Sequence, residues 1–139
     1  MKVLLTVVLA STPAWGADCL EYDVQVSLRG QLSESTYPEQ PNYESIEAGD
    51  AAATYFFLEP REAFCVSEKR YPFDPIPEES GINRVQLVFV DDAKDSYASL
   101  RPHLGKEVTC TGDLFHQMTG HHHSTVLLWK AACRLSQDQ

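Results

Sequence analysis

The sequence VQLVFVDDAKDSYASLRPHLGKEVTCTGDLFH, residues 85–116, contains three successive patterns that decide the predicted fold. Residues 85–90 are mainly β-branched and aromatic, which is typical of a buried strand. Residues 91–104 then repeat apolar side chains at helical spacing, and Gly105 follows as a C-terminal cap. Residues 106–116 return to an alternation of apolar and polar side chains. We therefore expect a strand, a short helix and a second strand.

The segments on either side of this stretch add strands and loops. Residues 22–32 alternate between apolar and polar side chains, which predicts a half-buried strand. The remaining assignments are a strand pair or one bent strand over residues 53–58 and 63–66, a surface excursion over 71–81, and a last strand over 125–134. Residues 34–50 are polar and contain prolines, and we interpret them as a long loop of the kind that is often functional.

The predicted order is three strands, a short helix and two strands, with bends marked by Gly30 and Gly112. This order favours an all-β fold with one short helix, built as a small five-stranded OB-like barrel. A β-sandwich would need about seven strands, more than the patterns supply.

Size and charge limit the classes of function. The 139 residues are enough for one domain, which we place at residues 18–139. The chain has 11 basic and 20 acidic residues, giving a formal charge of -9. Because such a surface repels phosphates, we expect no nucleic-acid partner.

Residues 1–17 have the pattern of a signal peptide. Lys2 precedes the apolar run 3–10, and Ala14 and Gly16 suit the positions before a cleavage site after Gly16, with cleavage after Ala17 as the alternative. A buried N-terminal strand is the competing interpretation. The run is shorter than the roughly 20 residues that span a bilayer, so we expect no stable membrane insertion. The predicted location is the periplasm, where the mature chain would carry 10 basic and 20 acidic residues.

The four cysteines all follow the predicted signal peptide. In an oxidising compartment an even number favours two disulfides, with free buried thiols as the alternative. If the last two strands form a hairpin centred near Gly120 or His121, residue 110 lies opposite residues 131 to 133. This register predicts the pair Cys110–Cys133, and therefore Cys19–Cys65.

Four of the five histidines lie between His116 and His123, in the connection between the last two strands. This hairpin, residues 116–124, and the loop 41–50 supply the candidate binding residues Tyr43, Glu44, Ser45, Asp50, His116, His121, His122 and His123. In an OB-like barrel the two connections flank one end of the binding face. We therefore expect Tyr43 or Glu44 to contact His121 to His123.

Several of these motifs carry a resemblance to a known family. FHQMTGHHHS at 115–124, PNYESI at 41–46, GD at 49–50 and FCV at 64–66 resemble the bacterial exported family catalogued as domain of unknown function 4431. The resemblance spans nearly the whole predicted mature chain. It implies export, and it implies no established activity.

The histidine cluster has two physical interpretations. His121 and His123 point to one side of an extended segment, and with His116 across the hairpin they could bind Zn²⁺, Cu²⁺ or Ni²⁺. Alternatively, the histidines cap the hairpin by donating to turn carbonyls and pack on Tyr43 or Trp129. The hairpin contains no carboxylate that could orient the ligands, so we expect no cofactor and at most weak zinc binding.

No phosphate-binding loop, nucleophile elbow or protease triad pattern is present in the sequence, which favours a protein that is not an enzyme. The first expectation is a monomeric periplasmic binding or interaction module of a Gram-negative bacterium, working through residues 41–50 and 116–124. Its partner would be a periplasmic protein or a small ligand. The alternative is a secreted inhibitor or immunity protein that neutralises an exported toxin. A weak divalent-metal binder is third.

Overall fold

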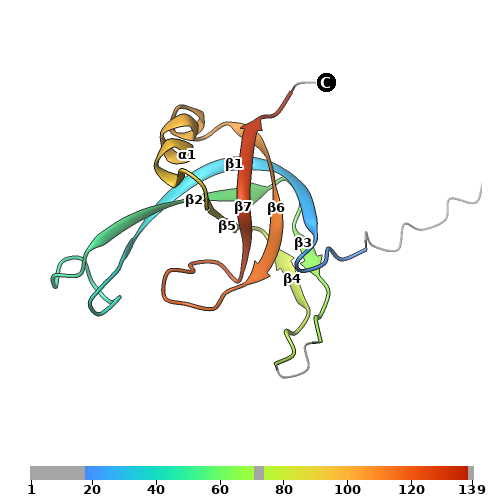
Figure 1. Ribbon diagram of the computed structural model, residues 1–139, viewed down its shortest axis with the longest axis horizontal. Coiled ribbons are helices and arrows are strands. Elements are labelled where there is room, and N and C mark those ends of the chain that lie inside the picture. The colour runs from blue at the N-terminus through green and yellow to red at the C-terminus, as the bar shows by residue number, and fades with distance from the viewer. Residues whose placement is uncertain (1–17, 71–73, 138–139) are drawn as a thin grey trace, which may run out of the picture.

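A computed structural model describes residues 18–70 and 74–137 (Figure 1). The predicted signal peptide lies outside these residues. The elements are β1 (Gln25–Pro38), β2 (Ala52–Pro60), β3 (Phe64–Val66), β4 (Glu79–Ile82), β5 (Val85–Val88), α1 (Ala93–Leu100), the 3-10 helix η1 (Arg101–His103), β6 (Glu107–His116) and β7 (Val126–Leu135). Among the described residues, no helix is both long enough and apolar enough to span a membrane.

Five of the strands form a closed ring in the order β1-β2-β5-β7-β6, and β6 pairs with β1 to complete it (Figure 1). The pairs are antiparallel except β5 with β7, which is parallel. The helix α1 lies between the third and fourth of these strands in the chain. The prediction of an all-β, OB-like ring of five strands with one short helix is confirmed.

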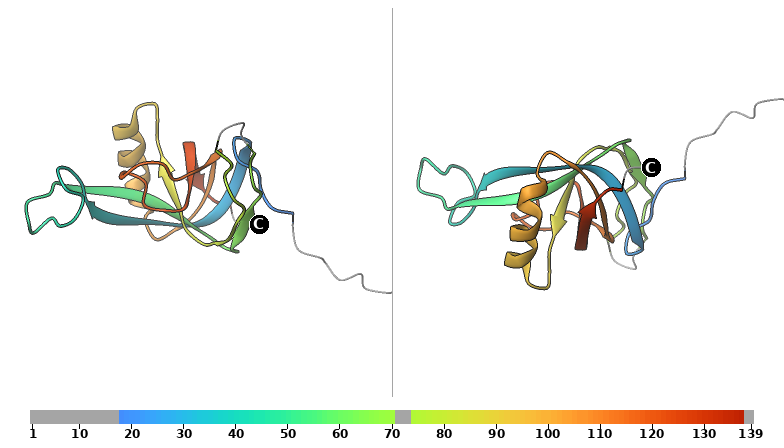
Figure 2. Two further views of the ribbon diagram at one scale, coloured as in Figure 1. Left: turned by 90° about the horizontal axis from the view of Figure 1, so that it is seen from below. Right: turned by 90° about the horizontal axis from the view of Figure 1, so that it is seen from above.

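The first strand is longer than its sequence pattern predicts. The expected loop began at Glu34, but residues 34–38 continue β1 and pair with β2 as far as Pro38 opposite Ala52. The loop therefore comprises residues 39–51. The prediction was wrong because backbone pairing with β2 holds this polar segment extended, although none of its side chains is buried. Figure 2 shows the resulting β1–β2 arm projecting from the ring.

The second correction concerns residues 53–66. The expected strand pair, or single bent strand, is instead two strands in different sheets. Here β2 belongs to the ring, while β3 pairs with β4, with Phe64 opposite Ile82. The expected surface excursion over residues 71–81 thus ends in the short strand β4, which pairs with β3.

Two glycines permit close backbone approaches inside the ring. A Cβ atom at Gly30 would lie 2.1 Å from the carbonyl oxygen of Glu59, and one at Gly112 would lie 2.6 Å from that of Trp129. Gly112 also falls at the register shift between β6 and β7. The strands can therefore curve around the core, whose largest fully buried side chains include Phe56, Phe57, Leu32, Leu58, Leu114 and Leu128.

Two disulfides fasten the strands. Cys110 on β6 lies directly opposite Cys133 on β7 and is bonded to it. Cys19, close to the first described residue, is bonded to Cys65 on β3. Both pairs agree with the pairing predicted from the hairpin register.

Candidate functional site

Loop 39–51 joins β1 to β2, and hairpin loop 117–125 joins β6 to β7. We call these two loops together the two-loop end. The buried carboxylate of Glu39, only 6% exposed, joins them. Its Oε2 lies 2.8 Å from Nδ1 of His121, and its Oε1 lies 3.4 Å from Nε2 of His123. The two loops therefore meet through a carboxylate placed between two imidazoles.

A tyrosine is the third partner of the Glu39 carboxylate. The hydroxyl of Tyr55, on β2, donates a hydrogen bond to Oε1 of Glu39. Burial by itself would raise the pKa of Glu39, but the hydrogen bonds from Tyr55 and His123 and the interaction with His121 outweigh it, so the pKa lies below its ordinary value. Glu39 is thus held ionised within the protein.

Aromatic rings pack around the two histidines. Tyr37 stacks on His123 with ring centroids 3.9 Å apart and planes within 5°. Tyr43 meets His121 edge to face at 5.7 Å. Arg84 donates to the hydroxyl of Tyr37 at 2.8 Å. The predicted meeting of the loops therefore occurs through Tyr43 rather than through the side chain of Glu44.

Asp50 organises the interior of loop 39–51. Its carboxylate accepts hydrogen bonds from the backbone N–H groups of Asn42, Glu44 and Ser45 at 2.9, 2.8 and 2.9 Å. The bonds from Ser45 and Glu44, followed by that from Asn42, hold the pKa of Asp50 below its ordinary value. The Oγ of Ser45 accepts from the N–H of Ala48 at 3.2 Å. Asp50 and Ser45, both predicted as binding residues, thus hold the loop in shape.

The buried side chain of Gln86, on β5, fixes the hairpin loop to the ring. Its amide donates to the carbonyl of His121 at 3.0 Å, and its Oε1 accepts from the N–H of His123 at 2.6 Å. The N–H of Gln86 donates to Oγ of Ser124 at 2.9 Å. The loop is therefore held at both its backbone and its side chains.

His122 caps the turn of the hairpin loop. Its Nδ1 accepts from the N–H groups of Met118 and Thr119 at 2.8 and 3.2 Å, and its ring meets Phe115 edge to face. His122 thus caps the hairpin as a hydrogen-bond acceptor, whereas we expected the histidines to donate hydrogen bonds to turn carbonyls. Burial, together with the neighbouring His121 and His123, lowers the pKa of His122.

His116 lies in a different environment from the other three histidines. Its Nε2 is 3.0 Å from Oε1 of Glu79, and its ring contacts Tyr22 edge to face at 6.2 Å. Burial, and next the charge of Glu79, raises the pKa of Tyr22 to about 12. The suggested metal ligands His116, His121 and His123 do not gather as one set of donor atoms within 4.8 Å of one another.

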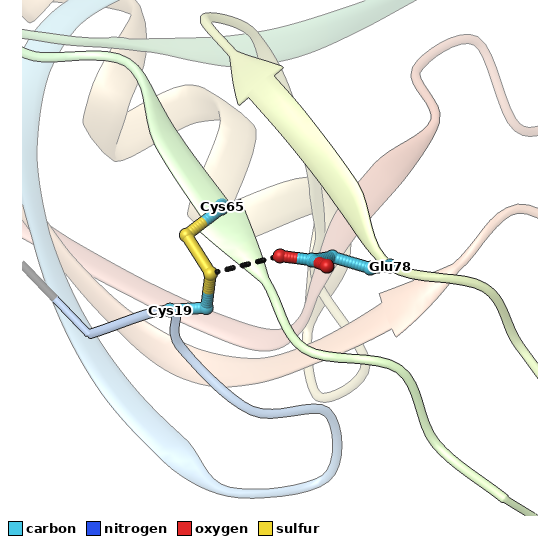
Figure 3. A group of neighbouring side chains, drawn as sticks. All are labelled: Cys19, Cys65 and Glu78. Carbon is cyan, nitrogen blue, oxygen red and sulfur yellow. Dashed lines mark hydrogen bonds between the residues drawn. A yellow bond between two sulfur atoms is a disulfide. The ribbon is translucent and has the colours of Figure 1, made fainter. Parts of the chain in front are cut away.

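Within residues 18–70 and 74–137, one group of three potential ligands does gather within 4.8 Å: Cys19, Cys65 and Glu78 (Figure 3). Oε1 of Glu78 lies 3.3 Å from Sγ of Cys19. The two sulfurs are bonded to each other, so neither is the thiolate that a metal would need. We therefore do not count this group as a metal site.

Sequence reasoning missed the residues that build the two-loop end around the histidines: Tyr37, Glu39, Tyr55, Arg84 and Gln86. Reading residues 34–38 as loop concealed the alternation that puts Ser35 and Tyr37 on one face of β1. Arg84 contacts both of these hydroxyls. Extending the strand pattern as far as Pro38 would have found that face. Nothing in the sequence pairs Glu39 with residues more than 80 positions later.

Residues 84–129 match the model of a family described as "Domain of unknown function (DUF4431)". The matching segment begins at Arg84 and includes the whole histidine hairpin, which confirms the resemblance over this range. No curated protein and no solved structure matches the chain.

Proposed function

We propose that this protein, which carries a DUF4431 segment, is a non-enzymatic binding module that recognises its partner through the two-loop end. The observation that carries the proposal is the placement of Glu39 between His121 and His123. It joins loop 39–51 to a hairpin that Gln86 already fastens to the ring. Prior ordering of a loop lowers the entropic cost of binding a partner.

The tip of loop 39–51 has the composition of a recognition surface. Tyr43 and Ile46 are 38% and 44% exposed although the surrounding backbone is fixed. The neighbouring Glu44 and Glu47 are exposed as well. Apolar anchors beside carboxylates suit a partner with an apolar patch next to basic side chains. Among the expected partners, a basic periplasmic protein fits this surface better than a small ligand.

The polar groups at the two-loop end support binding rather than catalysis. Oε1 of Glu39 accepts from Tyr55 and lies 3.4 Å from Nε2 of His123, whereas Oε2 lies 2.8 Å from Nδ1 of His121 without a hydrogen bond. Nδ1 of His122 is occupied by two backbone N–H groups. Groups used in this way hold a shape, whereas a general acid or base must reach a substrate proton.

Export to the periplasm is part of the proposal. Two disulfides are compatible with an oxidising compartment. Fusing residues 1–20 to alkaline phosphatase, which is active only after export, tests it. N-terminal sequencing of the secreted chain should begin at Ala17 or Asp18. An inactive fusion would contradict this part of the proposal.

Site-specific photo-crosslinking tests the recognition surface. We would replace Ile46 with p-benzoylphenylalanine, and use Glu62, an exposed residue between β2 and β3, as the matched control position. We expect a discrete adduct with one basic protein from position 46 and none from position 62. The adduct should weaken in a Glu39→Gln background. No adduct from position 46, or the same adducts from both positions, would overturn the proposal.

The acidic loop tip also favours a second candidate, a secreted inhibitor or immunity protein. Exposed Glu44 and Glu47 on a chain of net charge -9 would speed association with a basic enzyme. The crosslinked partner distinguishes the two. An inhibitor must abolish the partner's enzymatic activity at equimolar concentration, whereas a simple binding module leaves it intact.

A further inference from the structure

A second surface lies on the other side of the hairpin loop. Two cavities of about 380 and 330 Å³ adjoin there and share Asp23, Phe115 and Met118 among their lining residues. We call the combined hollow the Met118 groove. Tyr22 and Ile76 line one part of it, and Trp129 lines the other.

The groove exposes apolar side chains on a fixed backbone. Met118 is 82% exposed and Trp129 is 41% exposed. Phe115 contacts the Trp129 ring edge to face at 5.9 Å, which keeps both rings in place. The N–H of Met118 is bound by Nδ1 of His122, so its position on the turn is set. A flexible thioether beside fixed rings suits an apolar side chain of variable shape.

Carboxylates border this apolar surface. Asp74 is exposed and Asp113 is half-buried, and they line opposite parts of the groove. Asp23 is paired with Lys69 and contributes less net charge. Apolar rings bordered by carboxylates complement an apolar side chain flanked by cationic ones.

We propose that the Met118 groove is a docking site for an extended segment of a partner protein in which a large apolar residue has arginine or lysine two positions before and two positions after it, on the same side of the segment. The apolar residue lies between Phe115, Met118 and Trp129, and the cationic residues face Asp74 and Asp113. The groove shares the hairpin loop with the two-loop end, but it uses Met118 and His122, whereas the contacts of Glu39 use His121 and His123. The proposal therefore goes beyond the proposed function and does not depend on it.

Trp129 is a built-in reporter of the groove. The chain contains two tryptophans, Trp15 and Trp129, so a full-length Trp15→Phe variant leaves Trp129 as the single fluorophore. The probe is a seven-residue synthetic peptide with leucine at its centre, arginine two positions away on either side, and serine elsewhere. The matched peptide replaces each arginine with glutamate. Neither peptide contains an aromatic residue that would obscure the signal.

We expect the arginine peptide to shift Trp129 emission saturably, and to bind about tenfold more weakly to an Asp74→Asn Asp113→Asn variant. A Glu59→Gln Glu62→Gln variant makes the same change of charge at exposed residues outside the groove and should bind as the parent does. Raising the salt concentration should weaken binding.

Four results would overturn the proposal: no saturable shift, equal binding of the glutamate peptide, unchanged affinity in the Asp74→Asn Asp113→Asn variant, or an equal loss in the Glu59→Gln Glu62→Gln control. A Trp129 shift that depends on protein concentration without peptide would instead assign the groove to a second copy of the chain. A shift with phosphatidylglycerol vesicles but not with the peptide would assign it to a membrane surface.

Discussion

Oε2 of Glu39 lies 2.8 Å from Nδ1 of His121, a residue 82 positions later in the chain. This contact links loop 39–51 to hairpin loop 117–125. Among the described residues, Glu39 and Asp50 are the two buried carboxylates. Asp50 serves its own loop, whereas Glu39 joins two loops. The stability of the two-loop end should therefore depend on Glu39 more than on any other residue of the two loops.

Replacing Glu39 with Gln should destabilise the fold by about 1–3 kcal/mol, because the buried partner of Tyr55, His121 and His123 loses its charge. Urea unfolding of Glu39→Gln, His121→Ala and the double variant forms a double-mutant cycle. We expect the double variant to lose less than the sum of the single variants. Strict additivity would show that the contact contributes no stability.

The effect of Glu39→Gln should depend on pH. Because the pKa of Glu39 is lowered in the folded protein, its contribution is complete above the ordinary glutamate value of about 4.3 and is lost as pH falls through the lowered value. The difference in unfolding free energy between wild type and variant should therefore be constant from pH 7 to about 5.5 and shrink toward acid. A difference that grows on acidification would contradict the assignment.

The contribution of His122 to stability should also be lost on acidification, but at higher pH than that of Glu39. The pKa of its imidazole is lowered, so neutral Nδ1 accepts its two N–H groups above the ordinary histidine value of about 6.5, and this contribution is lost as pH falls toward the lowered value. His122→Ala should lower the free energy of unfolding by about 1 kcal/mol at pH 8 and by less at pH 5. Amide exchange at Met118 and Thr119 provides a local measurement, and unchanged exchange in the variant would contradict the capping role.

Gly30 should tolerate no side chain. An alanine Cβ would lie 2.1 Å from the carbonyl oxygen of Glu59, which belongs to a paired backbone and cannot yield easily. Gly30→Ala should lower the free energy of unfolding by about 1–3 kcal/mol. The matched variant Ser27→Ala, at an exposed position of the same strand, should stay within about 0.5 kcal/mol of wild type. Equal melting temperatures for the two variants would contradict the close approach.

Zinc should stabilise the protein little. An ion present at about 1,000 times its dissociation constant would add about 4.1 kcal/mol, which a melting curve resolves easily. His116 faces Glu79 rather than His121 and His123, so the three imidazoles do not gather around one ion. A large rise in melting temperature at micromolar zinc, lost in His121→Ala His123→Ala, would show that Glu39 and these histidines rearrange into a metal site.

The sequence by itself determined the order of the ring strands and the helix, because periodicity reports which side chains a strand or helix buries. The stretch 85–116 specified a strand, a helix and a strand, and the hairpin register gave the Cys110–Cys133 pair. Local pattern failed at residues 34–38, where backbone pairing with β2 stabilises a mostly unburied strand. Hydrogen bonds of this kind depend on a neighbouring strand, and a single segment cannot reveal them.

Only the tertiary structure decided how the candidate residues are used. Composition marked the histidines and loop 41–50, and the topology placed them at one end, but the partners of each imidazole come from distant parts of the chain. Glu39 contacts His121 and His123, and Glu79 contacts His116. The backbone of the turn donates hydrogen bonds to His122. These partners are set by the strand order of the ring, because β5 pairs with both β2 and β7 and so brings the β1–β2 arm beside the hairpin loop. A charged side chain pairs only with groups within a few ångströms. The distance between Glu39 and its histidines is set by the folded ring and not by the sequence around either residue.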